Sequence, residues 1–146
     1  MPHYQNIFVQ RHNAMLRSID TFARPFYKNK TVIVDLPRNT MSQIERKKVD
    51  DMEKYLLGGL RKRPDVIVVD HETQIITLAE VTCCLPKNMP YWAHVKTQKY
   101  KDLVERIQDK TLTRTVLWTL EFGTDGQWSE SVVPFFRQTF PQAFLD

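Results

Sequence analysis

The spacing of apolar residues along the chain predicts an alternation of helices and strands. Some segments repeat apolar residues every three to four positions, which is typical of amphipathic helices, and others are short β-branched runs, which are typical of strands. The pattern predicts helices over residues 4–22, 41–57, 91–108 and 129–140. It predicts strands over residues 31–36, 65–69, 75–83 and 113–122. Helices that interleave with mostly apolar strands predict an α/β fold with a mixed sheet.

The polar residues 71–74 predict a hairpin turn between the second and third of these strands. With that turn, Asp65 lies directly opposite Glu80, and both side chains are on the same face of the sheet, about 4.5–5.5 Å apart at Cβ. Like charges at such a position are destabilising, and a divalent cation such as Mg²⁺ would compensate them. The alternative is that Asp65 begins a strand at a solvated rim and that Glu80 pairs with Arg63 or a lysine. A register slip of one residue would also put the two acids on opposite faces.

The predicted helix over residues 91–108 carries a stripe that changes from cationic to apolar. Its members are Lys96, Lys99, Tyr100, Leu103 and Ile107. Because Leu103 and Ile107 are expected to face the core, the lysines at the other end of the stripe are expected to lie over the sheet. The alternative is that the lysines extend from the edge of the core into water.

Length and composition indicate one domain over residues 1–146, because the chain shows no repeat, linker or low-complexity stretch. No apolar run approaches membrane-spanning length, and the first residues lack the plan of a signal peptide, so we expect no membrane association. The two cysteines, Cys83 and Cys84, are adjacent, and neighbouring cysteines rarely form a disulfide. This indicates a reduced, intracellular compartment and excludes a zinc knuckle.

The charge balance is mildly basic, with 21 Lys and Arg against 17 Asp and Glu, a formal charge of +4 and a pI near 9.1. Such a balance is compatible with binding a polyanion and does not require it. The clustering is more informative, because three local concentrations of basic residues lie beside the segments described above. They are residues 46–48, residues 61–63 and the group Lys96, Lys99 and Lys101.

Three motifs in a fixed order carry a resemblance to a known family. They are Arg63-Pro64-Asp65, Glu80-Val81-Thr82 and Lys96-Thr97-Gln98-Lys99-Tyr100. This order resembles the restriction-like endonuclease domain of site-specific non-LTR retrotransposons, in the PD-(D/E)XK nuclease superfamily. Residues 11–13 (RHN) and 121–123 (EFG) are similar to further motifs of that domain, so the resemblance covers roughly residues 10–127. It implies a restriction-endonuclease-like α/β fold, with a central mixed β-sheet flanked by helices.

The resemblance also implies a role for each site residue. Asp65, Glu80 and the main-chain carbonyl of Val81 would hold Mg²⁺ or Mn²⁺. Thr82 stands where the wider superfamily has a lysine, so the resemblance implies that Lys96 supplies the catalytic amine, with Lys99 as the alternative. The residues expected to contact DNA are Arg63, Lys99, Tyr100, Arg11 and His12. For His12, a hydrogen bond inside the protein is an equally good expectation.

The expected activity is nicking of double-stranded DNA to leave a 3′-hydroxyl that can prime reverse transcription. The expected partners, besides DNA, are a reverse-transcriptase domain and the element RNA in a longer parent protein, in a nuclear or otherwise intracellular location. Two alternatives stay open: a Holliday-junction resolvase-like or repair nuclease of the same fold, and a DNA-binding domain without activity.

Overall fold

The structure is a computed structural model that describes residues 3–57 and 62–144. Its elements follow the order helix, strand, helix, two strands, helix, strand, helix. The helices are α1 (His3–Ala23), α2 (Gln43–Tyr55), α3 (Met89–Thr111) and α4 (Val132–Thr139). The strands are β1 (Lys30–Val34), β2 (Val66–Asp70), β3 (Ile76–Cys84) and β4 (Thr115–Gly123). The predicted α/β class is therefore confirmed.

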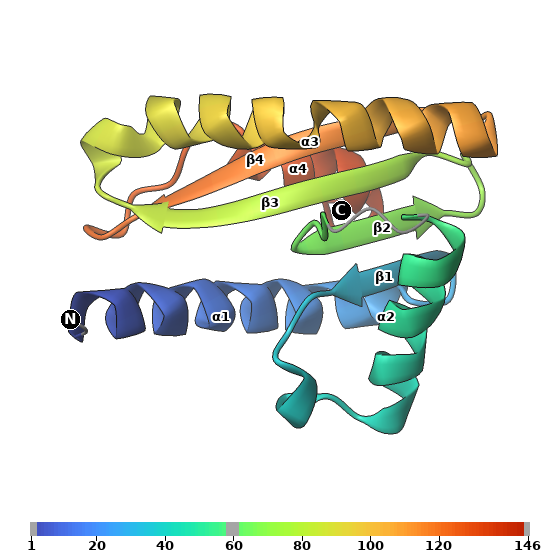
Figure 1. Cartoon of the computed structure of the whole chain (residues 1–146), viewed down its shortest axis with the longest axis horizontal. Helices are drawn as coiled ribbons and strands as arrows, with labels where there is room; N and C mark the ends of the chain where they lie inside the picture. Colours follow the sequence, from blue (N-terminus) through green and yellow to red (C-terminus); the bar gives the residue numbers. More distant parts are fainter. Residues whose placement is uncertain (1–2, 58–61, 145–146) are drawn as a thin grey trace.

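The strands form one four-stranded mixed sheet in the order β1-β2-β3-β4. β1 and β3 both run antiparallel to β2, whereas β4 runs parallel to β3. The parallel step requires a crossover, and α3 provides it. Figure 1 shows α3 along one face of the sheet and α1 along the other. Within the described residues, no helix has the length and apolar character that crossing a membrane requires.

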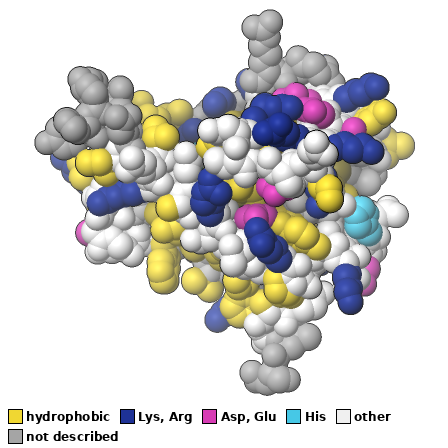
Figure 2. Space-filling model, turned by 90° about the horizontal axis from the view of Figure 1, so that it is seen from below, with side chains coloured by type: hydrophobic (Ala, Val, Ile, Leu, Met, Phe, Trp, Pro, Cys, Tyr) yellow, Lys and Arg dark blue, Asp and Glu magenta, His cyan; other side chains and the backbone are white. Residues whose placement is uncertain are grey.

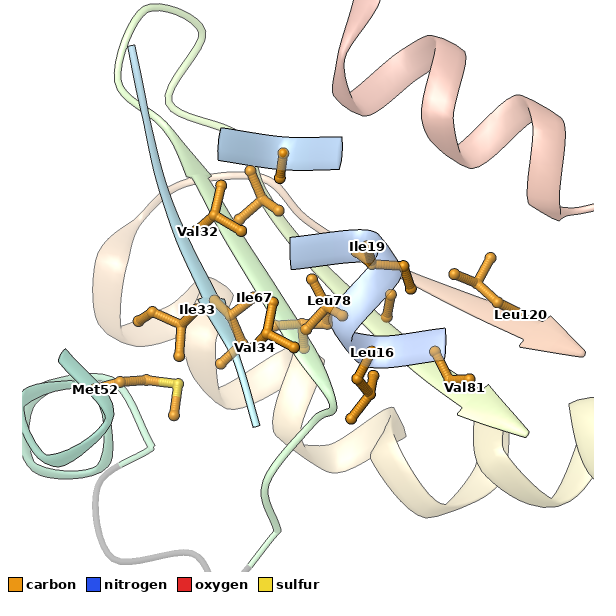
Figure 3. Packing of buried hydrophobic residues seen from close by; sticks show 14 of the residues in the cluster. Leu16, Ile19, Val32, Ile33, Val34, Met52, Ile67, Leu78, Val81 and Leu120 are labelled. Carbon is orange, nitrogen blue, oxygen red and sulfur yellow. The ribbon is translucent and has the colours of Figure 1, made fainter. Parts of the chain in front are cut away.

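Each of the two long helices packs against the sheet through a stripe of helical period. On α1 the stripe comprises Leu16, Ile19 and Ala23, which are almost fully buried. Figure 3 shows Leu16 and Ile19 lying over the sheet near Val81 and Leu120. Full burial of a leucine or isoleucine side chain contributes about 1.5–3 kcal/mol. This packing fixes the position of α1 relative to β3, and with it the position of the residues one turn earlier on α1.

The opposite face of the sheet is covered by α3 in the same way. Tyr100, Leu103 and Ile107 are buried against it, as the predicted stripe requires. The helix begins at Met89, earlier than predicted, because Pro90 occupies the first turn, where its missing N–H costs no hydrogen bond. Lys96 therefore lies inside the helix, and the burial of Tyr100, Leu103 and Ile107 fixes the side of the helix from which the Lys96 side chain extends.

The prediction for the last helix was wrong at its start, because α4 begins at Val132 rather than at residue 129. Residues 128 and 129 instead lie beside the end of β4, and a turn at residues 130 and 131 leads into the helix. Trp128 forms an isolated bridge with Phe122, and the Ser129 N–H donates to the Glu121 carbonyl at 2.9 Å. Because these hydrogen bonds are to a strand, the helix can form only after them.

Candidate active site

The predicted hairpin register is confirmed, since Val66 pairs with Ala79 and Ile67 with Leu78. β2 begins at Val66, so its pairing with β3 stops at Ala79. β3 continues to Cys84, and beyond Ala79 no described strand pairs with that edge. Asp65 therefore lies just before β2, at the point where the ladder ends.

Two hydrogen bonds hold Asp65 against the end of β3, one to the Glu80 side chain and one from the Val81 main chain. The Asp65 N–H donates to Glu80 Oε1 at 2.9 Å, and the Val81 N–H donates to Asp65 Oδ2 at 2.8 Å. Glu80 thus accepts the main-chain N–H of Asp65 itself, and Asp65 accepts the main-chain N–H of the residue after Glu80. The carboxylate of Asp65 thus lies where a neighbouring strand would otherwise continue the ladder, next to Glu80.

Lys96 is the lysine of α3 that reaches this pair. Its Nζ lies 3.0 Å from Glu80 Oε2, and the Glu80 side chain is only 3% exposed. The amine of Lys99 instead lies over the Tyr100 ring, 5.2 Å from its centroid, and the residue is exposed. Of the two lysines left open by the sequence, geometry therefore favours Lys96 as the partner of the carboxylates.

His12 approaches the same pair from the opposite side of the sheet. Its Nε2 lies 3.1 Å from Asp65 Oδ2, and its ring is partly buried. The hydrogen bond to Asp65 raises the pKa of His12 above its ordinary value, against the opposing effect of burial. Asp65 is thus held between a histidine of α1 and the main chain of β3, while Glu80 is held by a lysine of α3.

The site disfavours two ionised carboxylates and attracts positive charge. Burial raises the pKa of Glu80, the charge of Asp65 raises it further, and Lys96 opposes both effects. Burial also raises the pKa of Tyr100, whose hydroxyl is close enough to Glu80 to feel its charge. The site thus brings two acids, one amine and one imidazole together beside β3, and the pKa values of Glu80 and His12 are both raised there.

Two residues expected to contact DNA are engaged within the protein instead. The Arg63 guanidinium pairs with Asp35 and, at 2.7 Å, with Glu53. The Tyr100 side chain is 2% exposed, and its hydroxyl donates to the Arg63 carbonyl at 3.1 Å. In this arrangement both side chains brace the segment that leads into Asp65, and their contact with DNA stays a prediction.

Arg11 and Lys99 remain available on the surface. The Arg11 guanidinium donates to the Thr124 carbonyl at 3.5 Å, just after the end of β4. The Lys99 carbonyl accepts a hydrogen bond from the partly exposed Lys62 at 2.7 Å, which brings a further cation to this side. Figure 2 shows that Lys and Arg side chains are spread over one face of the molecule, with a few acidic groups among them.

Sequence reasoning missed Asp35, which is tied to the site twice. Its N–H donates to the Asp65 carbonyl at 2.8 Å, and its carboxylate pairs with Arg63. Burial raises the pKa of Asp35, and Arg63 opposes that effect. The signal that could have found it is an aspartate at the end of the otherwise apolar run TVIVDL.

The donor set fits a hard divalent cation. Carboxylate oxygens are the ligands of Mg²⁺ and Mn²⁺, and both acids already attract cationic side chains. The Val81 N–H points to Asp65, and in a strand the carbonyl of the same residue points to the same edge, so this oxygen also faces the pair. Across residues 3–57 and 62–144, no three His, Cys, Asp or Glu side chains form a group that could hold a metal ion. Asp65, Glu80 and Val81 would therefore share such an ion with water or a phosphate.

The comparisons with known proteins add no relative. No family model matches the chain, and neither the curated proteins nor the solved structures contain a match.

Proposed function

We propose that the chain is a metal-dependent DNA endonuclease domain of the PD-(D/E)XK kind. The observation that supports this most is the contact of 3.0 Å between the Lys96 amine and Glu80, whose carboxylate is also hydrogen-bonded to the main chain of Asp65. Two carboxylates can hold a divalent cation for hydrolysis of a phosphodiester, and a neighbouring amine can stabilise the charge that grows on the phosphate. The order of the three motifs in the sequence points to the same chemistry.

A purely structural role explains this cluster less well. Burying ionised groups costs free energy, and a buried ion pair is often no more stabilising than apolar residues of similar volume. The cluster also stands at the end of a strand pairing, where solvent and a substrate can approach Asp65. Titratable groups with shifted pKa values, such as Glu80 and His12, are common at functional sites.

The side chains would divide the work as follows. When bound by Asp65 and Glu80, the metal would polarise the scissile phosphate and lower the pKa of a water molecule. Lys96 orients the attacking water, or stabilises the charge that grows on the phosphate oxygens. His12 fixes the direction of the Asp65 carboxylate, and Arg11 and Lys99 bind phosphates on either side of the site.

The motif resemblance extends the proposal to a biological setting. The nick would leave a 3′-hydroxyl that primes reverse transcription, in a nuclear or otherwise intracellular location. A reverse-transcriptase domain and the element RNA would act with the domain within a longer protein. A resolvase-like or repair nuclease would use the same site on four-way junctions or damaged DNA. Substrate preference separates these roles.

One observation favours a second candidate, a DNA-binding domain without activity. Thr82 occupies the strand position of the usual lysine, and its hydroxyl is buried without a hydrogen-bond partner among the described residues. On this hypothesis the ion pair of Lys96 with Glu80 only stabilises the fold.

Nicking of supercoiled plasmid with Mg²⁺ or Mn²⁺ tests the proposal. We expect the wild-type protein to nick the plasmid with either metal and not in EDTA, and we expect Asp65→Ala and Glu80→Ala to remove the activity. Glu72→Ala serves as the matched control, because Glu72 is an exposed acid in the hairpin turn at the other end of β2. Wild-type protein that binds DNA and leaves the plasmid intact with both metals would establish the binding-only candidate.

A further inference from the structure

An open cavity of about 610 Å³ lies against the end of β3, at the edge that β2 leaves unpaired. In Figure 1 this end of the strand extends beyond β2, between the first turns of α1 and α3. Phe8 and Val9 of α1 line one side of the cavity, Trp92 of α3 lines the other, and Cys83 lies between them. Its volume is within the range of about 300–1,000 Å³ that is typical of small-molecule pockets.

The cavity is continuous with the candidate active site. His12, Val81 and Lys96 belong to its lining, and each of them contacts one of the two carboxylates through its side chain or main chain. Trp92 precedes Lys96 by four residues on α3, so one turn of helix separates the aromatic ring from the amine. A group bound beside Trp92 is therefore directly adjacent to the reacting centre.

The walls combine flat apolar surfaces with a polar edge. Phe8 and Trp92 are partly exposed aromatic side chains, and the exposed Leu85 adds apolar surface. The Val81 N–H points to the free edge of β3, so the N–H and carbonyl of Cys83 point to the same edge, two residues further on. Together with the amide of Asn88, which also lines the cavity, they supply donors and acceptors beside the aromatic rings.

The charges around the cavity suit a strand of nucleic acid. The Lys96 amine is at one end, beside Glu80. Arg11 lies outside the cavity lining, and its guanidinium contacts the Thr124 carbonyl. The Thr124 N–H in turn donates to Cys84, the last residue of β3, at 3.1 Å. Cations near an apolar pocket suit the phosphates that flank a base.

We propose that this cavity receives a single unpaired nucleobase of the DNA strand, stacked on Trp92. This inference rests on the proposed function, because it takes DNA as the ligand of the adjoining site. A base within an intact duplex is covered on both faces by its neighbours and cannot enter an apolar pocket. The domain therefore prefers DNA with a bulged or otherwise extrahelical nucleotide over a fully paired duplex.

A peptide strand fits this edge of β3 less well than a nucleobase does. Strand addition depends on a series of main-chain hydrogen bonds along a free edge. Here the Val81 N–H already donates to Asp65, and β3 ends at Cys84, so Cys83 supplies the remaining free rung of the strand. One rung cannot hold an extended peptide in register.

Binding to two duplexes that differ by one bulged 2-aminopurine tests the proposal. The assay uses Ca²⁺, with a gel to verify that the DNA stays uncut, and the fluorescence of the 2-aminopurine reports stacking on the protein. We expect wild-type protein to bind the bulged duplex about 5- to 150-fold more tightly than the paired one, and to quench the fluorescence. Trp92→Ala should abolish both the preference and the quenching, while the affinity for the paired duplex stays unchanged.

Two further variants keep the result interpretable. Trp128→Ala is the matched control, because this tryptophan is 60% exposed and lines a different pocket. Trp92→Leu retains apolar packing and removes the stacking surface, so it should lose the preference even if Trp92→Ala does not fold. Equal affinity of the wild-type protein for the two duplexes, or a preference that survives Trp92→Leu, would overturn the base pocket.

The same experiment separates this inference from the proposed nuclease activity. A Trp92-dependent preference in a protein that nicks no DNA with Mg²⁺ or Mn²⁺ supports the pocket and contradicts the nuclease. Metal-dependent nicking by a protein with no preference for the bulge contradicts the pocket alone.

Discussion

At the scale of single residues, the carboxylates of the candidate site are fixed by the main chain as well as by cations. Asp65 Oδ2 accepts a hydrogen bond from the Val81 N–H, and Glu80 Oε1 accepts one from the Asp65 N–H. Their other contacts are to the side chains of His12 and Lys96. The main chain thus holds both acids in place, and His12 additionally orients Asp65.

A different acid, Glu121, is buried and only weakly compensated. It is 3% exposed, and its Oε2 has no hydrogen-bond partner among the described residues. Burial raises its pKa, against hydrogen bonds to Ser129 and Thr119 that lower it. In the unfolded chain the same group ionises near the ordinary glutamate pKa of about 4.3, so ionisation favours unfolding. The stability of the protein should therefore fall as the pH rises from about 4.3 through the pKa of the folded state.

We predict that Glu121→Gln stabilises the protein at neutral pH. The free energy of unfolding at pH 7.5 should rise by on the order of 1 kcal/mol, because the neutral side chain avoids the cost of a buried charge. The gain should become much smaller near pH 4, where the wild-type side chain is protonated in the folded state and largely protonated in the unfolded state. Urea denaturation at the two pH values measures this difference. A gain that is as large at pH 4 as at pH 7.5 would show that the charge of Glu121 is not the cause.

Some of these residues could be read from the sequence and others could not. Asp65 and Glu80 belong to one hairpin, so the length of the turn was enough to predict that they face each other. The contact of His12 with Asp65 spans 53 residues and depends on how α1 packs across the sheet, which no local pattern encodes. The burial of Tyr100 was only half predicted, because its stripe indicated an inward direction but not how deeply the ring is covered.

At the scale of elements, the β2–β3 hairpin positions one half of the site, and Asp70 holds its turn. The Asp70 Oδ1 accepts hydrogen bonds from the N–H groups of Glu72 and Thr73. Its Oδ2 lies 2.9 Å from the amine of Lys30 on β1, whose side chain is 2% exposed. One carboxylate therefore caps the turn, neutralises a buried lysine and links β1 to β2.

We predict that Asp70→Ala costs about 3 kcal/mol of stability, because it leaves the Lys30 ammonium buried without its partner. Asp50→Ala is the matched control. It breaks the pair with Arg38 on the surface, where both side chains are at least half exposed, and should cost less than about 1 kcal/mol. Thermal and urea unfolding of the two variants measure both values. Equal losses in the two variants would contradict the buried pair as the cause.

The order and type of the helices and strands followed from the sequence, and the boundaries followed less well. Helical and strand periodicity identified each element because buried faces impose it. The start of α4 was missed because residues 128 and 129 bond to β4, a tertiary contact that their own composition does not reveal. The start of α3 was missed because a proline is compatible with the first turn as well as with a loop.

At the scale of the whole molecule, the candidate site depends on both helical layers and the sheet between them. α1 provides His12 and α3 provides Lys96. Because β2 begins only at Val66, the edge of β3 beyond Ala79 is open where these two side chains meet. The same opening forms the cavity beside Trp92, so one feature of the sheet accounts for the reacting groups and for access to them. The target sequence is not encoded in this arrangement, because the groups around the site suit phosphates and bases of any sequence.

The central claim is that the amine from α3 makes the carboxylate pair a reactive centre instead of a structural ion pair. The most direct test is the single-turnover rate of plasmid nicking with Mn²⁺ for Lys96→Ala and Lys99→Ala. These variants remove the same side chain from positions three residues apart, and only Lys96 contacts Glu80. We predict that Lys96→Ala lowers the rate at saturating protein by about 10²- to 10³-fold, while Lys99→Ala weakens DNA binding and leaves that rate within a few-fold of wild type. Equal rates for Lys96→Ala and the wild-type protein would contradict the claim.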